Sequence, residues 1–409
     1  MMLLGAGQAW ARPSAAHAPG LIAGPVAPGT ITTIAGGVGG PGPATRVSLR
    51  PCAMTSSGGD LYVADNVNQN GYLSATIRAI SGRTGWLTTP AGNGVAEAVV
   101  PPGTPARAAA LAGTCGLAFD RWGDLITTSD ASGFPLAQVI DVVPAATGRR
   151  YGQAMHAGDI YPIAGVPIVG GPLGDGGPAT KAVLTAGALA IDASGNIIEA
   201  DIGHYRIRVI AAVSGTFYGI AMTAGDIYTV AGDGMPGFSG DRGPAVRAHI
   251  FMGGTIQIPR AGLAVDAAGN ILFADSRNNR VRVVAGQTGR FYGLAMTEGD
   301  IYTVAGSGAW VYGGDGGPAR QAGLFAPAGL AVDRDGNVVV ADSGHHRVRV
   351  VAVRTGRFYG LAMRAGDIYT VAGNGRNRDA GDGGPARRAA LQTPSAISLD
   401  AAGNVVIGD

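Results

Sequence analysis

One sixteen-residue stretch occurs three times in this 409-residue chain with few changes. It reads FYGIAMTAGDIYTVAG from Phe217, FYGLAMTEGDIYTVAG from Phe291 and FYGLAMRAGDIYTVAG from Phe358, and a looser copy, YGQAMHAGDIYPIAG, begins at Tyr151. The IYTVAG ends of the three copies, and the IYPIAG end of the looser one, follow each other at spacings of 67, 74 and 67 residues. A recurrence at a nearly fixed spacing indicates a repeat architecture, in which each copy forms one unit that packs against its neighbours.

One period, residues 327–373, contains four short apolar runs separated by turn residues. The runs are PAGLAVD, NVVVADS, RVRVVAV and IYTVAG, with a D-x-x-G-N turn after the first and the FYGLAM connection before the last. Apolar runs bounded by Gly, Asn and Asp are typical of β-strands. Because four successive strands form the unit of a β-propeller blade, each repeat is interpreted as one blade.

We therefore predict an all-β fold, a six-bladed β-propeller of four-stranded antiparallel blades that covers residues 30–409. The first strands of the blades are expected to start near residues 51, 114, 186, 260, 327 and 394. IYTVAG would be the fourth and outermost strand of a blade, and packing between neighbours would bury both faces of each sheet.

The last blade is expected to be incomplete. The sixth repeat ends at Asp409 after its second strand, whereas TITTIAG at residues 30–36 matches a fourth strand with no blade before it. We expect this N-terminal strand to close the last blade, which leaves one strand missing. The chain could be a fragment that lacks a C-terminal strand, the leader could supply a substitute, or the gap could pair with a strand of another chain.

Residues 1–29 form an apolar leader rich in small residues, with A-x-A patterns at residues 9–11 and 16–18. The leader has no basic start and only a short apolar run, so we interpret it as a truncated export signal or as a disordered segment. The export interpretation predicts a secreted or cell-envelope protein. A membrane span is not expected, because no later segment approaches the roughly 18 uninterrupted apolar residues that a spanning helix needs.

The charge distribution gives no indication of nucleic-acid binding. The formal net charge is +2, and nearly all positive residues are arginines spread along the repeats without a basic run. Such arginine usage is more typical of a GC-rich genome than of phosphate recognition.

The most regular repeat carries a family resemblance. GDGGPA, a leucine and then PAGLAVDRDGNVVVADSGHHRVRVV at residues 327–351 resemble an NHL-repeat propeller, whose repeats run P-x-G-I-A-V-D, G-N-I-Y-V-A-D and N-R-I-x-V. The resemblance covers about residues 30–409 and is strongest from 174 onwards, although a period of about 67 residues exceeds the usual 40 to 50. It implies the propeller fold, and for function it implies only a range, from protein-, RNA- or ligand-binding modules to distant lactonases and lyases.

Aspartates recur where the second strand of a repeat ends, at Asp65, Asp130, Asp201, Asp275 and Asp342. Arginines follow three of these aspartates five residues later, at Arg206, Arg280 and Arg347. This spacing favours a structural pair across a tight turn, in which the aspartate also accepts backbone N–H bonds. A catalytic ring of carboxylates is the alternative.

A turn on the same rim carries His204, Asn278 and His345 in three consecutive repeats, and His346 follows the last. These four side chains could bind a ligand or a divalent metal. They could equally be selected because Asn and His tolerate positive φ in a tight turn.

The GDGGPA loops place aspartates at equivalent positions, Asp175, Asp315 and Asp382, with Asp241 in the variant GDRGPA. Each aspartate could contribute to a calcium site, but one carboxylate supplies only one or two of the six to eight oxygens that calcium needs. A glycine-shaped turn is the competing interpretation. No cofactor is otherwise expected.

The two cysteines occupy one repeat position in adjacent blades, at the start of the innermost strand. Cys52 and Cys115 could form a disulfide if their Cα atoms lie within about 7 Å, which an exported protein would permit. Two free buried thiols are the alternative.

These observations favour a non-enzymatic scaffold that binds a protein, peptide or glycan. The chain has no P-loop, no G-x-S-x-G elbow and no H-E-x-x-H motif. A metal-dependent lactonase, hydrolase or lyase is a second hypothesis, and its site would have to break the repeat symmetry near Asn66, Asn68, Asn70 and Asp130. A sensor or adhesive module of a longer protein is the third.

Overall fold

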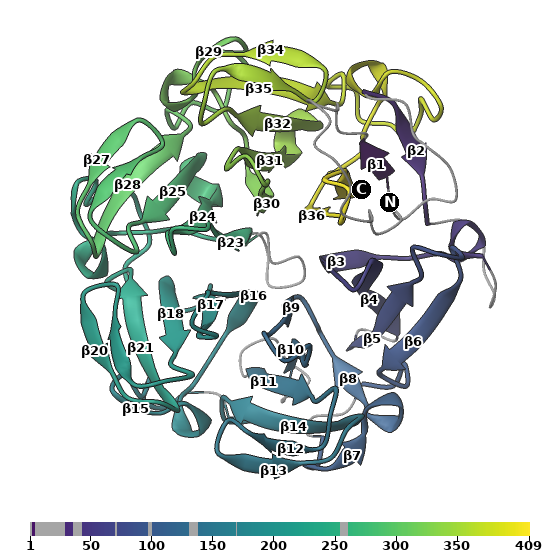
Figure 1. Ribbon diagram of the computed structural model, residues 1–409, viewed down its shortest axis with the longest axis vertical. Helices are drawn as coiled ribbons and strands as arrows, with labels where there is room; N and C mark the ends of the chain where they lie inside the picture. The colour runs from purple at the N-terminus through teal and green to yellow at the C-terminus, as the bar shows by residue number, and fades with distance from the viewer. Residues whose placement is uncertain are drawn as a thin grey trace, which may run out of the picture.

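Strands arranged around a central axis make up nearly all regular structure of the protein (Figure 1). The computed structural model describes residues 2–4, 29–35, 43–69, 72–96, 100–130, 138–168, 170–253 and 261–409. Within these ranges there is no α-helix. The 3₁₀ helices are single turns: η1 (Ala44–Arg46), η2 (Ala106–Ala108), η3 (Ala179–Lys181), η4 (Ala245–Arg247), η5 (Ser276–Asn278), η6 (Ala319–Gln321), η7 (Ser343–His345) and η8 (Ala386–Arg388).

Five sheets are blades, each drawn from one region of the chain. The first contains β3 (Pro51–Ser57), β4 (Asp60–Gln69), β5 (Tyr72–Ile80) and β6 (Leu87–Ala91), with β8 (Leu111–Ala112) paired to β5. The second contains, from its outer to its inner edge, β7 (Thr104–Pro105), β14 (Asp159–Ala164), β11 (Gln138–Val143), β10 (Leu125–Asp130) and β9 (Leu117–Phe119).

The other three blades repeat the arrangement of the second. In the same order, the third contains β15 (Gly177–Pro178), β21 (Asp226–Ala231), β18 (Arg206–Ile210), β17 (Ile197–Asp201) and β16 (Ala186–Ile191). The fourth contains β22 (Gly243–Pro244), β28 (Asp300–Ala305), β25 (Arg280–Val284), β24 (Ile271–Asp275) and β23 (Leu263–Val265). The fifth contains β29 (Gly317–Pro318), β35 (Asp367–Ala372), β32 (Arg347–Val351), β31 (Val338–Asp342) and β30 (Pro327–Val332).

The predicted six-bladed propeller of four-stranded blades is wrong. In the described part of the chain there are five blades, not six, and each is a five-stranded sheet. The remaining sector of the ring holds a four-stranded closing sheet shared by both ends of the chain, in the order β2 (Ile31–Thr33), β1 (Met2–Leu4), β37 (Val405–Gly408) and β36 (Ala396–Leu399). The prediction missed the fifth strands because segments of only two residues, mostly Gly-Pro, are too short to show an apolar alternation.

The closing sheet also corrects the prediction of an incomplete last blade. The segment β1 pairs antiparallel with β37 on one side and with β2 on the other, so the leader supplies the strand that the sequence left unassigned. The closing sheet therefore has no strand missing at this position, and the predicted gap for pairing with another chain is filled. The rest of the leader, residues 5–28, lies outside the described residues.

The core consists of separate layers, each between neighbouring sheets. One layer packs Ile198 and Val209 of the third blade against Phe273 of the fourth, and all three are fully buried. Alternate residues of the same strands face the opposite neighbour, as Ile197 does toward the second blade. Each sheet thereby buries both of its faces, which explains why strands such as RVRVV carry β-branched residues on both sides.

The repeated FYG segments form short hairpins beside the blades, not strands within them. The hairpins pair β12 (Gly148–Arg150) with β13 (Gln153–Met155), β19 (Gly215–Phe217) with β20 (Ile220–Met222), β26 (Gly289–Phe291) with β27 (Leu294–Met296), and β33 (Gly356–Phe358) with β34 (Leu361–Met363). Tyr292, at the turn, adopts φ 53° and donates its hydroxyl to Asp266 at 2.7 Å. Asp266 opens the D-x-x-G-N turn, so the repeated tyrosine fastens the hairpin to its own blade.

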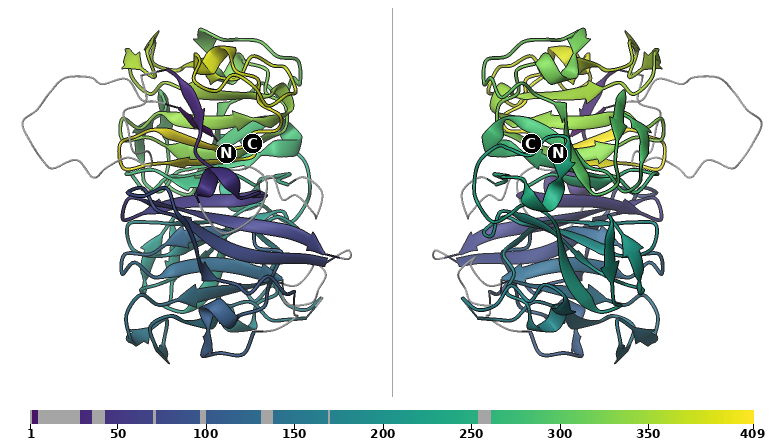
Figure 2. Two further views of the ribbon diagram at one scale, coloured as in Figure 1. Left: turned by 90° about the vertical axis from the view of Figure 1, so that its right-hand side faces the viewer. Right: turned by 90° about the vertical axis from the view of Figure 1, so that its left-hand side faces the viewer.

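The first blade breaks the symmetry of the ring. Its strands β4 and β5 have 10 and 9 residues, compared with 5 residues in the matching strands of the third blade. The side views show this hairpin extending beyond one face of the ring (Figure 2).

No described helix is long and apolar enough to cross a membrane.

Candidate functional site

Completely buried arginines connect two motifs that lie far apart within each repeat. In the fifth blade, the guanidinium of Arg349 lies 2.8 Å from Asp315 of the GDGGPA loop and 3.3 Å from Asp342 at the end of β31. The third and fourth blades have the same arrangement, with Arg208 between Asp175 and Asp201 and with Arg282 between Asp241 and Asp275. These arginines are fully excluded from solvent.

The predicted partners Arg206, Arg280 and Arg347 hold other groups. Arg206 lies directly opposite Asp201 in the antiparallel pair, but its guanidinium donates to the carbonyls of Gly232 and Asp233. The side chain extends outward past the end of β21, whereas Arg208, two residues later, turns to Asp201. The second arginine of each R-x-R pattern was the missed signal, because a charged residue inside an apolar strand indicates a buried partner.

The aspartates at the ends of the second strands organise the preceding loop. Asp275 accepts the backbone N–H of Phe251 at 2.8 Å, and Asp342 accepts that of Phe325 at 2.8 Å. Asp65 and Asp201 accept backbone N–H groups in the same way, from Arg50 and Thr185. Burial raises the pKa of Asp275, although Arg282 and the hydrogen bonds from Asn278 and Phe251 oppose the shift.

The second blade departs from this pattern. At the position of the buried arginine it has Asp141, which is 2% exposed and accepts a hydrogen bond from Ser129 at 2.5 Å. Burial raises the pKa of Asp141 to about 6, and the Ser129 bond opposes the shift. Asp130 is buried at the end of β10.

The predicted rim residues each contact the aspartate of their own blade. His204 lies 2.7 Å from Asp201, and Asn278 donates to Asp275 at 2.7 Å. His345 lies 2.9 Å from Asp342, and its other ring nitrogen lies 2.8 Å from the carbonyl of Trp310.

His346, the fourth member of this predicted set, adopts φ 55° and contacts the carbonyl of Gln392. The structure therefore distributes these side chains over three blades and does not bring them together. No group of three or more His, Cys, Asp or Glu suited to a metal occurs in the part of the chain that the structure describes.

The aspartate of a GDGGPA loop forms an ion pair with the buried arginine of the third strand in the blades that contain this arginine. Partial burial opposes ionisation of Asp315, but Arg349 and the hydrogen bonds from Thr370 and Tyr312 outweigh it and lower its pKa. Asp382 belongs to the loop beside the closing sheet, where the third strand is β1 and provides no arginine, and its side chain is exposed.

The two cysteines meet at the inner edge of the first two blades. Cys52 and Cys115 form a disulfide, with 5.0 Å between their Cα atoms. Beside it, buried Asn66 donates its amide to the carbonyl of Thr114 at 2.9 Å. Of the other asparagines singled out from the sequence, Asn68 lies in β4 and Asn70 lies outside the described residues.

The innermost strands line the central channel with small and apolar side chains. Alongside the disulfide, the lining includes Ala188, Gly262 and Leu330. Ser395 is the one polar side chain in the described part of this lining, which therefore offers little to hold a polar substrate.

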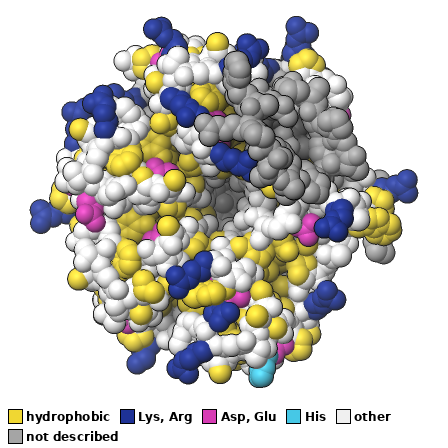
Figure 3. All heavy atoms as spheres, viewed as in Figure 1, with side chains coloured by type: hydrophobic (Ala, Val, Ile, Leu, Met, Phe, Trp, Pro, Cys, Tyr) yellow, Lys and Arg dark blue, Asp and Glu magenta, His cyan; other side chains and the backbone are white. Residues whose placement is uncertain are grey.

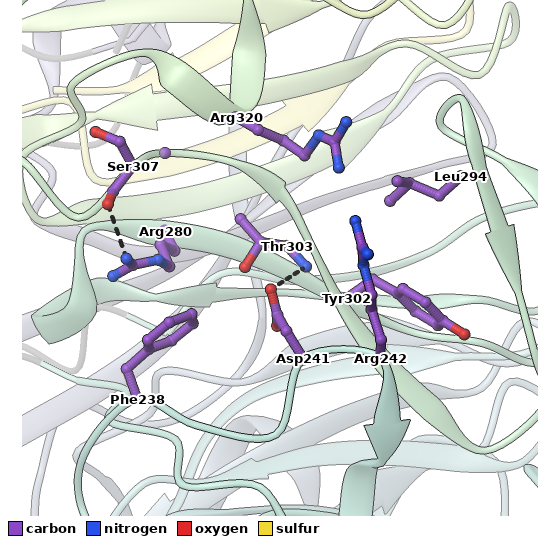
Figure 4. Close-up of a pocket in the computed structure, with 10 residues that line it drawn as sticks. Phe238, Asp241, Arg242, Arg280, Leu294, Tyr302, Thr303, Ser307 and Arg320 are labelled. Atoms are coloured by element: carbon purple, nitrogen blue, oxygen red, sulfur yellow. Dashed lines mark hydrogen bonds between the residues drawn. The ribbon is translucent and has the colours of Figure 1, made fainter.

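A polar pocket lies at the outer rim between the fourth and fifth blades (Figure 4). Its volume is about 300 Å³. Three arginines line it from different elements: Arg242 from the GDRGPA loop, Arg280 from the start of β25 and Arg320 from η6. Figure 4 shows the guanidinium groups of Arg242 and Arg320 directed toward the same space.

One of these arginines, Arg242, makes this rim position different from its equivalents, whereas Arg320 has an arginine counterpart in Arg387. Arg242 has φ 69°, where Gly176, Gly316 and Gly383 have φ of 79°, 77° and 76° in the other loops. A left-handed conformation is unfavourable for a residue with a Cβ, so Arg242 stands in a backbone conformation that glycine would adopt at lower cost. At the Arg320 position, the preceding repeat has Val246.

The pocket carries excess positive charge. Asp241 is its one acidic lining residue, and that carboxylate already pairs with the buried Arg282 at 2.8 Å. Neither Arg242 nor Arg320 makes an ion pair with any residue that the structure describes, and both are exposed.

The third arginine of the pocket is held in place. Arg280 lies over Phe238, 3.7 Å from the ring centroid, and donates to the carbonyl of Ser307 at 2.8 Å. Burial lowers the pKa of Arg280. On the face shown in Figure 3, Lys and Arg side chains are scattered over the described surface, some at the circumference and some nearer the centre.

Comparisons with known proteins agree with the repeat pattern. The NHL repeat family model matches residues 326–351, which contain β30, β31 and β32. Teneurin-1 of Homo sapiens is 31% identical over 115 residues, which are 26% of this chain and 4% of that protein. The chain therefore spans only a small fraction of the length of this curated relative.

Solved structures match over most of the chain. A protein of unknown function from Bacteroides thetaiotaomicron has a TM-score of 0.56 and 14% identity, covering 94% of this chain and 72% of that chain. Virginiamycin B lyase from Staphylococcus aureus has a TM-score of 0.37 and 12% identity, covering 79% of this chain and 69% of that chain. At such identities the first likeness shows the fold alone, and the second is too distant to carry an argument.

Proposed function

We propose that this NHL-repeat β-propeller is a secreted or cell-envelope binding module that holds an anionic ligand in the pocket of Arg242, Arg280 and Arg320. The NHL-repeat resemblance expected from the sequence is confirmed by the family match at residues 326–351 together with the propeller fold. The binding role extends this result, and it rests on the pocket.

The observation that carries the proposal is a pair of arginines that make no ion pair with the described residues, one of which adopts an unfavourable backbone conformation. Arg242 stands where the other loops have glycine, and Arg320 faces the same space. Guanidinium groups bind carboxylate, phosphate and sulfate with paired, charge-assisted hydrogen bonds. Two exposed guanidinium groups that face one space are therefore suited to an acidic group of a protein, peptide or glycan.

The residues that the structure describes give less support to the alternative function, a metal-dependent enzyme. Their channel lining is mostly small and apolar, and their His, Cys, Asp and Glu side chains form no group of three suited to a metal. The binding proposal needs no metal, and calcium can be tested directly. Thermal unfolding after EDTA treatment should not change when calcium is restored, whereas a calcium-specific rise would revive the loop aspartates Asp175, Asp241, Asp315 and Asp382.

The proposed location outside the cytoplasm is supported by the disulfide, because disulfides persist in oxidising compartments. Fractionation of producing cells, with alkylation of free thiols before lysis, tests this location. Unmodified, disulfide-linked protein outside the cytoplasm is expected. Protein confined to the cytoplasm with two alkylated cysteines would contradict it. Such a module could also be the sensor or adhesive part of a longer protein.

The binding test uses replacements that the chain itself already contains at equivalent positions. Arg242→Gly and Arg320→Val copy Gly176 and Val246, so neither should disturb the fold. Polygalacturonate, poly-L-glutamate and dextran sulfate serve as polyanions, and neutral dextran serves as the control. The native protein should bind at least one polyanion, and the double variant should bind it at least tenfold more weakly by calorimetry.

The matched control is Arg247→Gln, which copies Gln321 and removes one exposed positive charge away from the pocket lining. This variant should bind like the native protein. Equal losses in the double variant and in Arg247→Gln would indicate nonspecific attraction, and no binding of any polyanion by the native protein would overturn the proposed function.

A further inference from the structure

Exposed aromatic side chains cluster where the loop that leads away from the arginine pocket meets the segment after η6. Trp310 is 65% exposed, and Tyr312 and Phe325 are 38% and 42% exposed. The ring centroids of Trp310 and Phe325 lie 6.3 Å apart. Contiguous apolar surface of this kind on a soluble protein marks a site of interaction.

The aromatic cluster is fixed in place by its neighbours. His345 packs against both Tyr312 and Phe325, with centroids 5.5 and 5.9 Å away, and it contacts the carbonyl of Trp310 at 2.8 Å. Arg347 lies over the Tyr312 ring, 3.9 Å from its centroid. His345 therefore supports the loop that presents the aromatic rings, which accounts for a residue that the sequence suggested as a ligand.

The cluster is continuous with the pocket through one loop, residues 306–317. Ser307, at the start of this loop, lines the pocket and accepts a hydrogen bond from Arg280. Asn279 donates to the carbonyl of Gly308 at 3.3 Å and accepts the backbone N–H of Ala326, the neighbour of Phe325, at 3.0 Å. Arg280 and Asn279 thus hold this loop where it borders the pocket, and Asn279 also holds the segment that carries Phe325.

The outer edges of the fourth and fifth blades are covered at this site, which leaves no room for a peptide to bind as an added strand. The outer strand β28 already pairs with β22, and the next free donor, the N–H of Thr303, is taken by Asp241 at 3.2 Å. In the fifth blade, β29 covers β35, and the N–H of Thr370 is taken by Asp315 at 3.1 Å. Strand addition needs such unpaired backbone groups, so it is blocked here.

We propose that the ligand is an acidic polysaccharide, whose carboxylate or sulfate groups pair with Arg242 and Arg320 and whose sugar rings stack on Trp310, Tyr312 and Phe325. This inference rests on the proposed function of the pocket and specifies its ligand. The C–H faces of a pyranose match a flat aromatic ring. The arginine, threonine, serine and tyrosine side chains of the pocket are suited to hydroxyl and acidic groups together, and the neighbouring exposed rings add surface for stacking.

The test compares two exposed tryptophans. Trp310→Ala removes the most exposed ring of the cluster, and Trp86→Ala removes a 56% exposed ring of the first blade. The probes are polygalacturonate, dextran sulfate, the galacturonate monomer, poly-L-glutamate and neutral dextran. Trp310→Ala should weaken binding of the acidic polysaccharide at least tenfold and leave monomer binding within a factor of two, and Trp86→Ala should change neither.

The outcomes separate this inference from the proposed function. If poly-L-glutamate binds as tightly as the acidic polysaccharides, or if Trp310→Ala has no effect while Arg242→Gly with Arg320→Val abolishes binding, the polysaccharide assignment is overturned and the anion site stands. If neutral dextran binds equally well, the role of the arginines is overturned. Binding of polygalacturonate or dextran sulfate that needs both Trp310 and the two arginines would support the inference.

Discussion

The guanidinium of Arg282 lies 2.8 Å from the carboxylate of Asp241, the residue immediately before Arg242. Arg282 is fully buried, and it also lies 3.7 Å from Asp275 at the end of β24. The buried ion pair therefore fixes the loop that presents Arg242 to the pocket. The same buried arginine–aspartate pair occurs in three blades, and in the fourth blade it supports the loop in which Arg242 replaces glycine.

Removal of a buried arginine should strongly destabilise the propeller. Arg349→Met leaves the carboxylates of Asp315 and Asp342 without their shared partner, and breaking a buried pair in this way costs about 3 to 5 kcal/mol. The midpoint of urea unfolding should fall accordingly. Arg354 is the matched control, because it pairs with Asp335 but its side chain is 63% exposed.

Arg354→Met should change the free energy of unfolding by less than about 0.5 kcal/mol, since exposed ion pairs contribute little. Similar losses in the two variants would contradict the structural role assigned to the buried arginines. Binding of polyanions by the residual folded Arg349→Met protein is not part of this test, because its loops are expected to shift.

Glycine at position 242 should stabilise the protein slightly while it weakens ligand binding. Arg242 adopts φ 69°, which costs a residue with a Cβ about 1 kcal/mol, and the greater chain entropy of unfolded glycine offsets part of this gain. We expect Arg242→Gly to raise the free energy of unfolding by about 0.5 kcal/mol in urea titrations. Arg320→Gly, at a position with ordinary φ, should lower it by a similar amount. A lower stability for Arg242→Gly would indicate that the arginine supports the fold.

The repeat unit could be predicted from the sequence because its strands and turns depend on patterns of neighbouring residues. The run RVRVVAV and the D-x-x-G-N turn both indicate strands and turns from neighbouring residues alone. The count of blades and of strands per blade failed because it depends on contacts between distant segments. A three-residue strand at Met2–Leu4 and two-residue strands such as Gly177–Pro178 carry no periodicity that could reveal them.

The site was harder to predict than the fold. His204 and Asp315 were predicted as site residues because they recur in several repeats. In the structure they contact Asp201 and Arg349 of their own blades. Arg242 was visible as the one departure from GDGGPA, but its neighbour Arg320 belongs to the next repeat. Only the packing of two blades brings these residues to one pocket, so a comparison within single repeats could not find it.

Loss of the disulfide should destabilise the protein. Cys52 and Cys115 are separated by 63 residues, and closing a loop of that length removes entropy from the unfolded chain equivalent to about 4 kcal/mol. Cys52→Ser with Cys115→Ser should therefore lower the free energy of unfolding by an amount of this order. Reductant should lower the melting temperature of the native protein but leave that of the double variant unchanged. Equal melting temperatures with and without reductant would contradict a stabilising bond.

The buried carboxyl of Asp141 should make stability depend on pH. Its pKa rises from 3.8 when unfolded to about 6 when folded, because burial opposes ionisation. The folded state thus binds the proton more tightly, so the contribution to stability is complete below pH 3.8 and is lost as the pH rises through 6. The shift corresponds to about 3 kcal/mol.

Asp141→Asn cannot ionise, so it should be more stable than the native protein at pH 8 by up to about 3 kcal/mol, and the difference should shrink toward pH 4. Urea unfolding at pH 4, 6 and 8 measures this difference. Asp335→Asn, at an exposed carboxylate, is the control and should show no such trend. A stability difference that is the same at pH 4 and pH 8 would mean that Asp141 does not titrate in this range, and that its hydrogen bond from Ser129 keeps it ionised in the folded state.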